Sequence, residues 1–222
     1  MAEDGEGDLW LFGYGSLIWK PPPHYDLRLP GYIEGYVRRF WQASEDHRGT
    51  PEAPGRVCTL IDRELWETLT DQHASAPPKV WGAAYRIPSQ HVPEVKEYLD
   101  IREINGYSIQ YTPFQIPKPQ DMTGTYQPVH IPSSSQSSHA GKPINCLVYI
   151  GLPDNPQFLG PQDPQALAEH IVKSRGPSGE NREYLYQLEE ALNGLSEGSG
   201  DEHISDLARR CREVEAREQS AE

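Results

Sequence analysis

The pattern of apolar and polar positions predicts strands in the first two thirds of the chain. Runs rich in β-branched and aromatic residues, some of them alternating with polar residues, are typical of strands. They lie at residues 9–12, 32–44, 56–62, 80–87, 108–116 and 144–151. Within the second run we expect a bulge at Gly35, and we expect residues 63–79 to be irregular.

The last third of the chain is predicted to be helical. Apolar residues at helical spacing predict helices over residues 164–175, 180–193 and 204–217, and one earlier helix over residues 91–99. Ser89, Ser178 and the pair Asp163-Pro164 stand where helix caps are expected. Strands that come first and helices that gather late indicate an α+β fold, with a curved or closed sheet and helices packed outside it.

We expect one domain over residues 9–217. Residues 117–143 are rich in proline and serine and predict a mobile insertion, since the strand pattern resumes at Ile144. Residues 1–8 and 218–222 are expected to be disordered tails.

Composition narrows the classes of partner. The 222 residues carry a net charge of −13, which disfavours contact with nucleic acid or an anionic membrane. No apolar run reaches the ~18 residues of a membrane helix, and the first residues have no signal-peptide pattern. The three cysteines are odd in number and widely separated, which indicates a reduced cytoplasmic or nuclear setting.

The first strand runs into a turn, Gly13-Tyr14-Gly15-Ser16-Leu17. Glycines allow backbone angles closed to other residues, and amides in such a turn can converge on an anion. The turn is therefore a candidate binding cradle, although a glycine turn after a strand is more often only a turn. The third glycine of a dinucleotide fingerprint, a G-K-[ST] loop and a G-x-S-x-G elbow are all missing.

Two further features bear on chemistry. The eight histidines include no H-x-H or H-x-x-x-H pair, so we expect no metal, and each histidine is read as a surface or core residue. Glu103 lies between Ile101 and Ile104, where apolar neighbours would disfavour its charged form and tune it as a general base. The pattern alone favours the simpler alternative, in which Glu103 pairs with Arg102 at the surface.

Several sequence blocks, taken together, are more specific than any single motif. In order they are FGYGSLIWKP, RRFWQ-x-S-x-D-HRG-x-P-x-x-PGRV, WG-x-AYR, YLD-x-RE-x-x-GY, YIG-x-x-DNP, LGP and GPSG-x-N-x-EYL. From about Leu9 to Leu188 this combination resembles the ChaC-type γ-glutamylcyclotransferases. The chain departs from the family pattern at residues 117–143 and 63–79, which look expanded.

The resemblance implies a γ-glutamylcyclotransferase-like fold with a mainly antiparallel, barrel-like sheet. It also implies cleavage of glutathione to 5-oxoproline and cysteinylglycine without a cofactor. Glu103 matches the family's catalytic glutamate. The residues that match the substrate-binding loop are Leu11, Phe12, Gly13, Tyr14, Gly15, Ser16 and Leu17.

Other matched residues have open roles. Arg48 is either a contact for a substrate carboxylate or part of a structural ion pair. Tyr107 and Tyr149 either line the pocket or pack in the core, Tyr14 either binds or packs beneath the turn, and Ser16 is a candidate helix cap.

Two alternative functions stay open at this point. One is a cyclotransferase for other γ-glutamyl dipeptides or γ-glutamylamines, and the other is a non-catalytic binding module. We expect a small-molecule substrate and a monomer or weak dimer.

Overall fold

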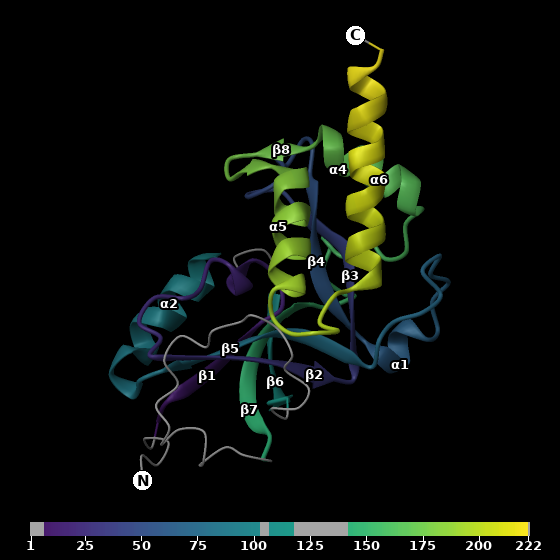
Figure 1. Ribbon diagram of the computed structural model, residues 1–222. Coiled ribbons are helices and arrows are strands. Elements are labelled where there is room, and N and C mark those ends of the chain that lie inside the picture. Colours follow the sequence, from purple (N-terminus) through teal and green to yellow (C-terminus); the bar gives the residue numbers. More distant parts are fainter. Residues whose placement is uncertain (1–6, 103–106, 118–141, 222) are drawn as a thin grey trace. The chain divides into compact units, whose positions relative to one another are not determined.

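A computed structural model of the protein describes residues 7–102, 107–117 and 142–221 (Figure 1). The chain forms two compact units. The first contains Met1–Glu34, Lys79–Ile150 and Ala191–Ser199, and the second contains Gly35–Pro78, Gly151–Glu190 and Gly200–Glu222. The single domain over residues 9–217 stays a prediction, and each unit is described by itself.

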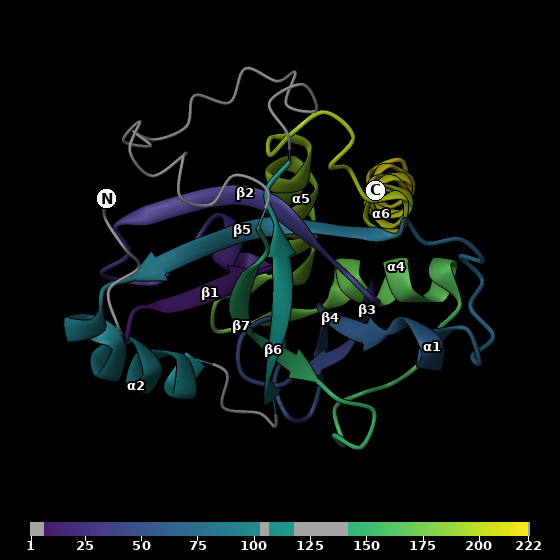
Figure 2. The same ribbon diagram turned by 90° about the horizontal axis from the view of Figure 1, so that it is seen from below.

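The first unit is a closed barrel of five strands (Figure 2). Around the barrel they follow one another as β1 (Leu9–Gly13), β5 (Lys79–Ile87), β2 (Leu27–Glu34), β6 (Tyr107–Gln115) and β7 (Ile144–Gly151). β5 is antiparallel to β1 and β2, and β6 is antiparallel to β2. β1 and β7 pair in parallel, with Leu11 opposite Leu147. The predicted closed, mainly antiparallel sheet is confirmed.

Helix α2 (Val92–Arg102) covers part of this barrel. Val95 and Leu99 of the helix share one buried cluster with barrel residues such as Leu11, Tyr85 and Leu147. Burial of such a side chain contributes ~1.5–3 kcal/mol, which fixes the helix on the sheet. A short 3₁₀ helix, η2 (Ser89–His91), precedes α2 and begins after Pro88 without a side-chain cap, so the predicted cap at Ser89 is wrong.

The second unit joins a two-stranded sheet to helices. β3 (Tyr36–Ser44) pairs with β4 (Gly55–Asp62), and the short helix α1 (Arg63–Trp66) follows. The helices of the last third are α4 (Pro164–Lys173), α5 (Asn181–Asn193) and α6 (Glu202–Gln219), with a hairpin of β8 (Arg175–Gly176) and β9 (Gly179–Glu180) before α5. α4 contacts β4, and α6 contacts both β3 and α4. The three predicted helices of this region are confirmed.

Helix caps in this unit follow the sequence in one case and depart from it in another. The side chain of Asp163 accepts a hydrogen bond from the amide of Ala166 at 2.8 Å, and Pro164 opens α4 as predicted. Ser178 caps no helix, because it lies between β8 and β9 and its amide donates to the carbonyl of His47 at 2.9 Å. α5 begins at Asn181 instead.

The predicted single strand over residues 32–44 is wrong. Gly35 has a φ of +85°, a left-handed conformation that ends β2 and starts β3 in a different sheet. The sequence also missed the start of β2 at Leu27, because Pro30 inside the run argues against a strand. The stretch after Asp62, predicted to be irregular, begins with α1, where the amides of Glu64 and Leu65 donate to the Asp62 carboxylate.

A chain of hydrogen bonds inside the second unit fixes the histidine tautomers. Nε2 of His203 accepts from the amide of Phe40 at 3.0 Å, so its Nδ1 carries the proton and donates to Nδ1 of His73 at 3.0 Å. Nε2 of His73 then donates to Asp206 at 2.8 Å. Burial, with the positive charges of Arg39 and Arg38 nearby, lowers the pKa of His203 well below its usual value.

We expect this histidine to make stability depend on pH. The unfolded chain takes up a proton on His203 near its ordinary pKa of about 6.5, and the folded chain resists it. The contribution of His203 to the free energy of unfolding is therefore fully present above that pH. Below it, the free energy of unfolding falls by up to about 1.4 kcal/mol per pH unit. In His203→Gln the decline measured by urea unfolding between about pH 7 and pH 5 should be shallower. The exposed His47→Gln is the control, and an unchanged decline in His203→Gln would contradict the assignment.

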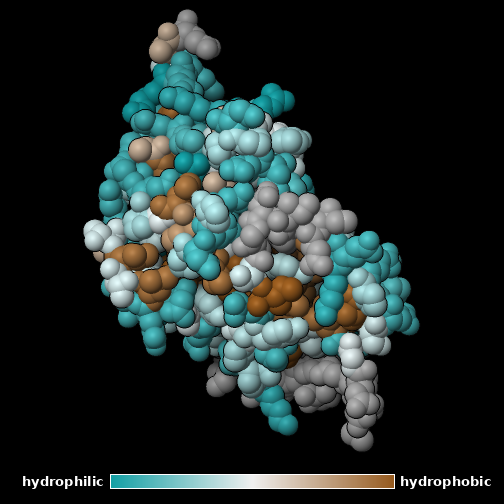
Figure 3. All heavy atoms as spheres, turned by 180° about the vertical axis from the view of Figure 1, so that it is seen from behind, coloured by the Kyte–Doolittle hydropathy of each residue, from teal (hydrophilic) through white to brown (hydrophobic). Residues whose placement is uncertain are grey.

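On the face drawn in Figure 3 hydrophilic side chains predominate, with hydrophobic atoms between them. Among residues 7–102, 107–117 and 142–221, no helix is long and apolar enough to cross a membrane.

Candidate functional site

The predicted cradle forms at the end of β1. After Gly13 the chain turns through Tyr14 and Gly15 into a 3₁₀ helix, η1 (Ser16–Ile18). The amide of Ile18 donates to the carbonyl of Gly15 at 2.9 Å, which closes the turn. Amides at the start of a helical turn have no partner within it and can bind an anion. Gly15 occupies the cap position without a side-chain hydrogen bond, so Ser16 does not cap this helix.

Two glycines allow the tight approach of the backbone here. A Cβ on Gly13 would lie 2.6 Å from the Cβ of Leu17. A Cβ on Gly82, in the neighbouring strand β5, would lie 2.3 Å from the carbonyl oxygen of Gly13 and 2.6 Å from the ring of Phe12. Real Cβ atoms essentially never come within 3.0 Å of such atoms, so both positions need glycine.

Three strands of the barrel hold the turn in place. The hydroxyl of Tyr14 donates to the carbonyl of Tyr149 on β7 at 2.8 Å. The hydroxyl of Tyr85 on β5 donates to the carbonyl of Leu17 at 2.7 Å. Arg28 on β2 donates to the Tyr85 hydroxyl at 3.2 Å and to the carbonyl of Ile18 at 3.4 Å. The turn is thus fixed by buried contacts rather than by its own sequence alone.

Arg28 also gives the turn a local charge. Its guanidinium is always protonated and lies against the carbonyl of Ile18, although the chain as a whole carries a net charge of −13. At an effective dielectric constant typical of a protein surface, unit charges a few ångströms apart interact by several kcal/mol. Arg28 therefore places a positive charge beside the carbonyl of Ile18, at the end of this turn.

The predicted base is not placed by the structure. Glu103 lies outside the described residues, and so does the side chain of Tyr107, the first residue of β6. Helix α2 ends at Arg102, the residue just before Glu103. Tyr149 is buried in the same cluster as Leu17, and its carbonyl accepts from Tyr14. Core packing is therefore the role that the described contacts support for Tyr149.

Arg48 belongs to a network of hydrogen bonds and an ion pair in the second unit. Its side chain donates to the carbonyl of Glu180 at 2.8 Å and lies 3.6 Å from the carboxylate of Glu183. Its amide donates to the hydroxyl of Ser44 at 3.0 Å, and only 5% of the residue is exposed. These contacts support the structural ion pair rather than a contact with substrate.

The comparison with models of protein families shows to which family the chain belongs. The sequence model of the family described as ChaC-like protein matches residues 9–214, a span that includes the cradle. The chain belongs to the ChaC-like family. The match spans most of both compact units, and of the strands and helices in the described residues it leaves out only the last residues of α6.

Relatives of this ChaC-like chain align with it over most of its length. A Schizosaccharomyces pombe protein named glutathione-specific γ-glutamylcyclotransferase is 43% identical and aligned over 96% of this chain and 95% of its own. A Saccharomyces cerevisiae protein of the same name is 40% identical, over 86% of this chain and 88% of its own. A solved structure of a yeast γ-glutamylcyclotransferase specific to glutathione has a TM-score of 0.80 and 34% identity, covering 94% of this chain and 97% of the other. The γ-glutamylcyclotransferase-like fold is therefore confirmed.

Sequence reasoning missed the residues that support the cradle of this ChaC-like chain. Gly82 and Tyr85 both stand in the block WG-x-AYR, whose pattern predicts only a strand. A glycine inside a strand pattern is itself a signal for a close backbone approach. Arg28 carried no such signal, since its partners Tyr85 and Ile18 come from other parts of the sequence.

We expect Tyr14→Phe to destabilise the protein by about 1–2 kcal/mol, because the buried carbonyl of Tyr149 loses its donor. Urea unfolding measures the change. Tyr25→Phe is the matched control, since the Tyr25 side chain is among the exposed aromatic ones. Equal stability of Tyr14→Phe and the parent would show that this hydrogen bond does not anchor the turn.

Proposed function

We propose that this ChaC-like protein is a γ-glutamylcyclotransferase that cleaves glutathione into 5-oxoproline and cysteinylglycine. The observation that carries the proposal is the 43% identity, over 96% of the chain, to a relative named glutathione-specific γ-glutamylcyclotransferase. The cradle at the end of β1 supports it, because residues 11–17, which match the substrate-binding loop of the family, form a tight turn suited to an anionic group.

The substrate supplies its own nucleophile in this reaction. The α-amine of the γ-glutamyl group attacks the side-chain carbonyl carbon, a C–N bond forms and a five-membered ring closes. Holding the amine and the carbonyl in this geometry can contribute as much as ~7–11 kcal/mol to the lowering of the barrier. The proposal therefore requires no catalytic serine or cysteine, and no cofactor or metal in the chemical step.

Glu103 is proposed as the general base. An α-amine near neutral pH is largely protonated and must lose a proton before it attacks. Glu103 directly follows α2 in the sequence. Leu99 of that helix and Leu17 of the cradle belong to one buried cluster, so the element that leads to Glu103 and the cradle rest on the same core.

The cradle is proposed to hold the substrate by its negative charge. Backbone amides of residues 11–17 would bind the α-carboxylate or the oxyanion of the tetrahedral intermediate, with Arg28 adding positive charge beside the turn. A donor aimed at such an oxyanion commonly contributes ~2.7–4 kcal/mol to transition-state stabilisation.

Collapse of the intermediate completes the reaction. As the ring closes, the attacking nitrogen loses a second proton and becomes the lactam N–H. Glu103 passes one proton to the cysteinyl nitrogen as its C–N bond breaks, and the other proton ends on the amine that is released. The products are 5-oxoproline, whose lactam group is neutral and whose carboxylate is retained, and cysteinylglycine with a protonated amine. No water is consumed.

The setting of the enzyme is part of the proposal. Its partner would be a small molecule and not nucleic acid or membrane, and the chain would act as a monomer or weak dimer in the cytoplasm or nucleus. Cys58, Cys146 and Cys211 are free and buried, which supports a reducing compartment. Burial raises the pKa of Cys58 to about 11 and that of Cys211 to about 12, so both are thiols near neutral pH.

A comparison of kcat/KM for two γ-glutamyl substrates tests this function. Purified protein should release 5-oxoproline from reduced glutathione with a higher kcat/KM than from γ-glutamylalanine. Comparable or better turnover of γ-glutamylalanine would instead favour a cyclotransferase for other γ-glutamyl compounds. Binding of glutathione without turnover of either substrate would indicate the non-catalytic module.

A further inference from the structure

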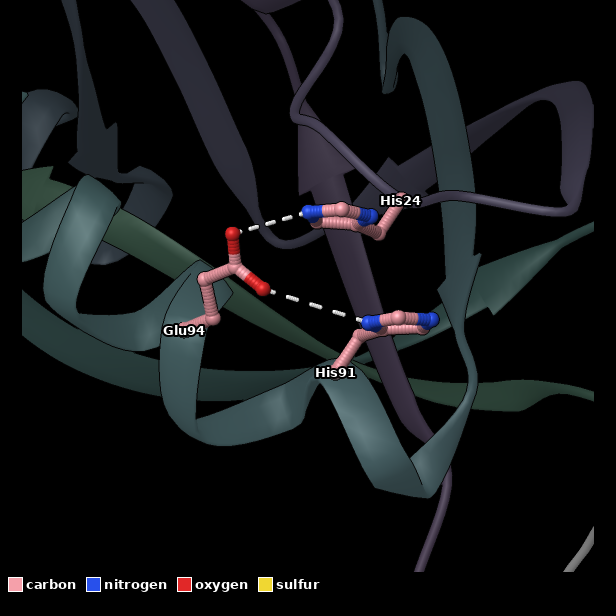
Figure 4. Close-up of side chains that lie close together, drawn as sticks. All are labelled: His24, His91 and Glu94. Atoms are coloured by element: carbon pink, nitrogen blue, oxygen red, sulfur yellow. Dashed lines mark hydrogen bonds and ion pairs between the residues drawn. The ribbon is translucent and has the colours of Figure 1, made fainter.

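A cluster of possible metal ligands lies on the first unit, outside the cradle. Among residues 7–102, 107–117 and 142–221, His24, His91 and Glu94 form the group whose ligand atoms all lie within 4.8 Å of one another. Nε2 of His24 is 3.0 Å from Oε1 of Glu94, and Nδ1 of His91 is 4.0 Å from Oε2. Figure 4 shows one nitrogen of each imidazole facing the Glu94 carboxylate, with a different carboxylate oxygen for each ring.

We propose that His24, His91 and Glu94 bind Zn²⁺ or a similar divalent transition-metal ion. Two imidazoles and a carboxylate are a donor set that zinc accepts, with water in the fourth position of a tetrahedron. Ligand atoms around such an ion stand about 3.3 Å apart, given metal–ligand distances of about 2.0–2.2 Å. The separations of 3.0 Å and 4.0 Å between the imidazole nitrogens and the Glu94 oxygens lie on either side of this value. The two rings now stack with centroids 4.3 Å apart and planes at 6°, so binding would require a tilt of the rings that turns both lone pairs toward the ion.

The backbone already holds His24 toward the other two residues. His24 has a φ of +60°, a left-handed conformation that is strained for a residue with a side chain. The segment after it is pinned to β5, because Asp26 makes two hydrogen bonds of 2.9 Å with Arg86 and the ring of Tyr25 meets that of Tyr85 edge to face. The strain is therefore maintained by fixed neighbours, as is common at binding sites.

The other two ligands are equally well placed. The amide of His91 donates to the carbonyl of Pro88 at 2.9 Å, and the amide of Ser89 donates to Asp8 at 2.9 Å, which fixes η2. Glu94 stands in the first turn of α2, one residue before the buried Val95. Both segments thus rest on the barrel, and binding would reorganise little beyond side chains.

A neighbouring amide can set the required tautomer. The side-chain nitrogen of Gln90 lies 3.1 Å from Nε2 of His91. A half-turn of that amide would let its oxygen accept the Nε2 proton of His91 and leave Nδ1 as the metal ligand, a support that ligating histidines commonly have.

This proposal departs from the prediction that the chain holds no metal. The ligands were missed because His24 and His91 lie far apart in the sequence and form none of the familiar histidine pairs. An ion here would join the segment after the cradle to the start of the helix that leads to Glu103. It would stabilise the fold without entering the proposed reaction.

Titration of the purified, tag-free full chain with zinc chloride against a chromogenic chelator tests the site. We expect one zinc per chain, and at least about tenfold weaker binding in His24→Gly and in Glu94→Gln. Glycine at position 24 keeps the positive φ without strain, so this variant should fold. His47→Ala is the matched control, because His47 is also exposed beside a carboxylate, with Nε2 3.8 Å from Asp46.

Thermal unfolding gives a second readout. Zinc at about one hundred times its dissociation constant should raise the Tm of the parent by roughly 5–10 °C, and this difference should largely vanish in both site variants. Zinc binding that is equal in the parent, His24→Gly and Glu94→Gln would overturn the proposal, as would a parent that binds no zinc.

Discussion

Glu103→Gln is expected to lower the release of 5-oxoproline from glutathione by about 10²- to 10⁴-fold. The amide keeps the size of the side chain but cannot take the proton from the substrate's α-amine. Because we propose that the cradle at residues 11–17, and not Glu103, binds the substrate, the loss should appear mainly in kcat rather than in KM. Steady-state kinetics with reduced glutathione measure both, and circular dichroism checks that the variant is folded.

The control for this variant comes from the same stretch of chain. Glu97→Gln removes the same charge from an exposed position of α2 and should leave kcat and KM close to those of the parent. An activity of Glu103→Gln equal to that of Glu97→Gln would remove Glu103 from the mechanism. The simpler reading, a surface pair with Arg102, would then stand.

Gly82→Ala is expected to reduce kcat/KM by about 10- to 100-fold, although Gly82 belongs to none of the matched binding residues. The added Cβ would lie 2.3 Å from the carbonyl oxygen of Gly13, and this backbone atom can relieve the clash only by moving the turn. A displacement of about 1 Å in a positioning element is enough to cost activity on this scale. The measurement is again steady-state kinetics on glutathione.

A second change on β5 separates geometry from stability. Ala84→Gly, on the same strand, removes a buried Cβ and should destabilise the protein by roughly 0.5–1 kcal/mol without pushing on the cradle. If the two variants lose stability to a similar extent, only Gly82→Ala should lose much activity. Full activity in Gly82→Ala would show that the position of the turn is not critical.

The sequence predicted those parts of the fold that local patterns determine. The run Ile144–Gly151 and the pair Asp163-Pro164 are confirmed because strand alternation and capping depend on near neighbours. The break at Gly35 escaped, since an apolar run looks the same whether it stays in one sheet or passes into another. Pro30 concealed the start of β2 for a related reason, because its tolerance in a strand depends on the partner strand.

In the candidate site, too, the sequence predicted the feature that depends on near neighbours and missed those that depend on distant ones. The turn around Gly13 and Gly15 could be found from sequence, since paired glycines after a strand constrain the backbone locally. The groups that hold it, such as Arg28 and Tyr85, come together only when the barrel closes. His24 and His91 are a further case, because two segments far apart in the sequence bring their imidazoles to 4.3 Å.

The measurement that tests the account most directly is an analysis of the products formed from reduced glutathione in water labelled with heavy oxygen. Intramolecular attack by the α-amine predicts equal amounts of 5-oxoproline and cysteinylglycine, with no label in the 5-oxoproline. Labelled glutamate in place of 5-oxoproline would mean that water is the nucleophile and would contradict the proposed mechanism. Glutathione left intact under the same conditions would contradict the proposed activity itself.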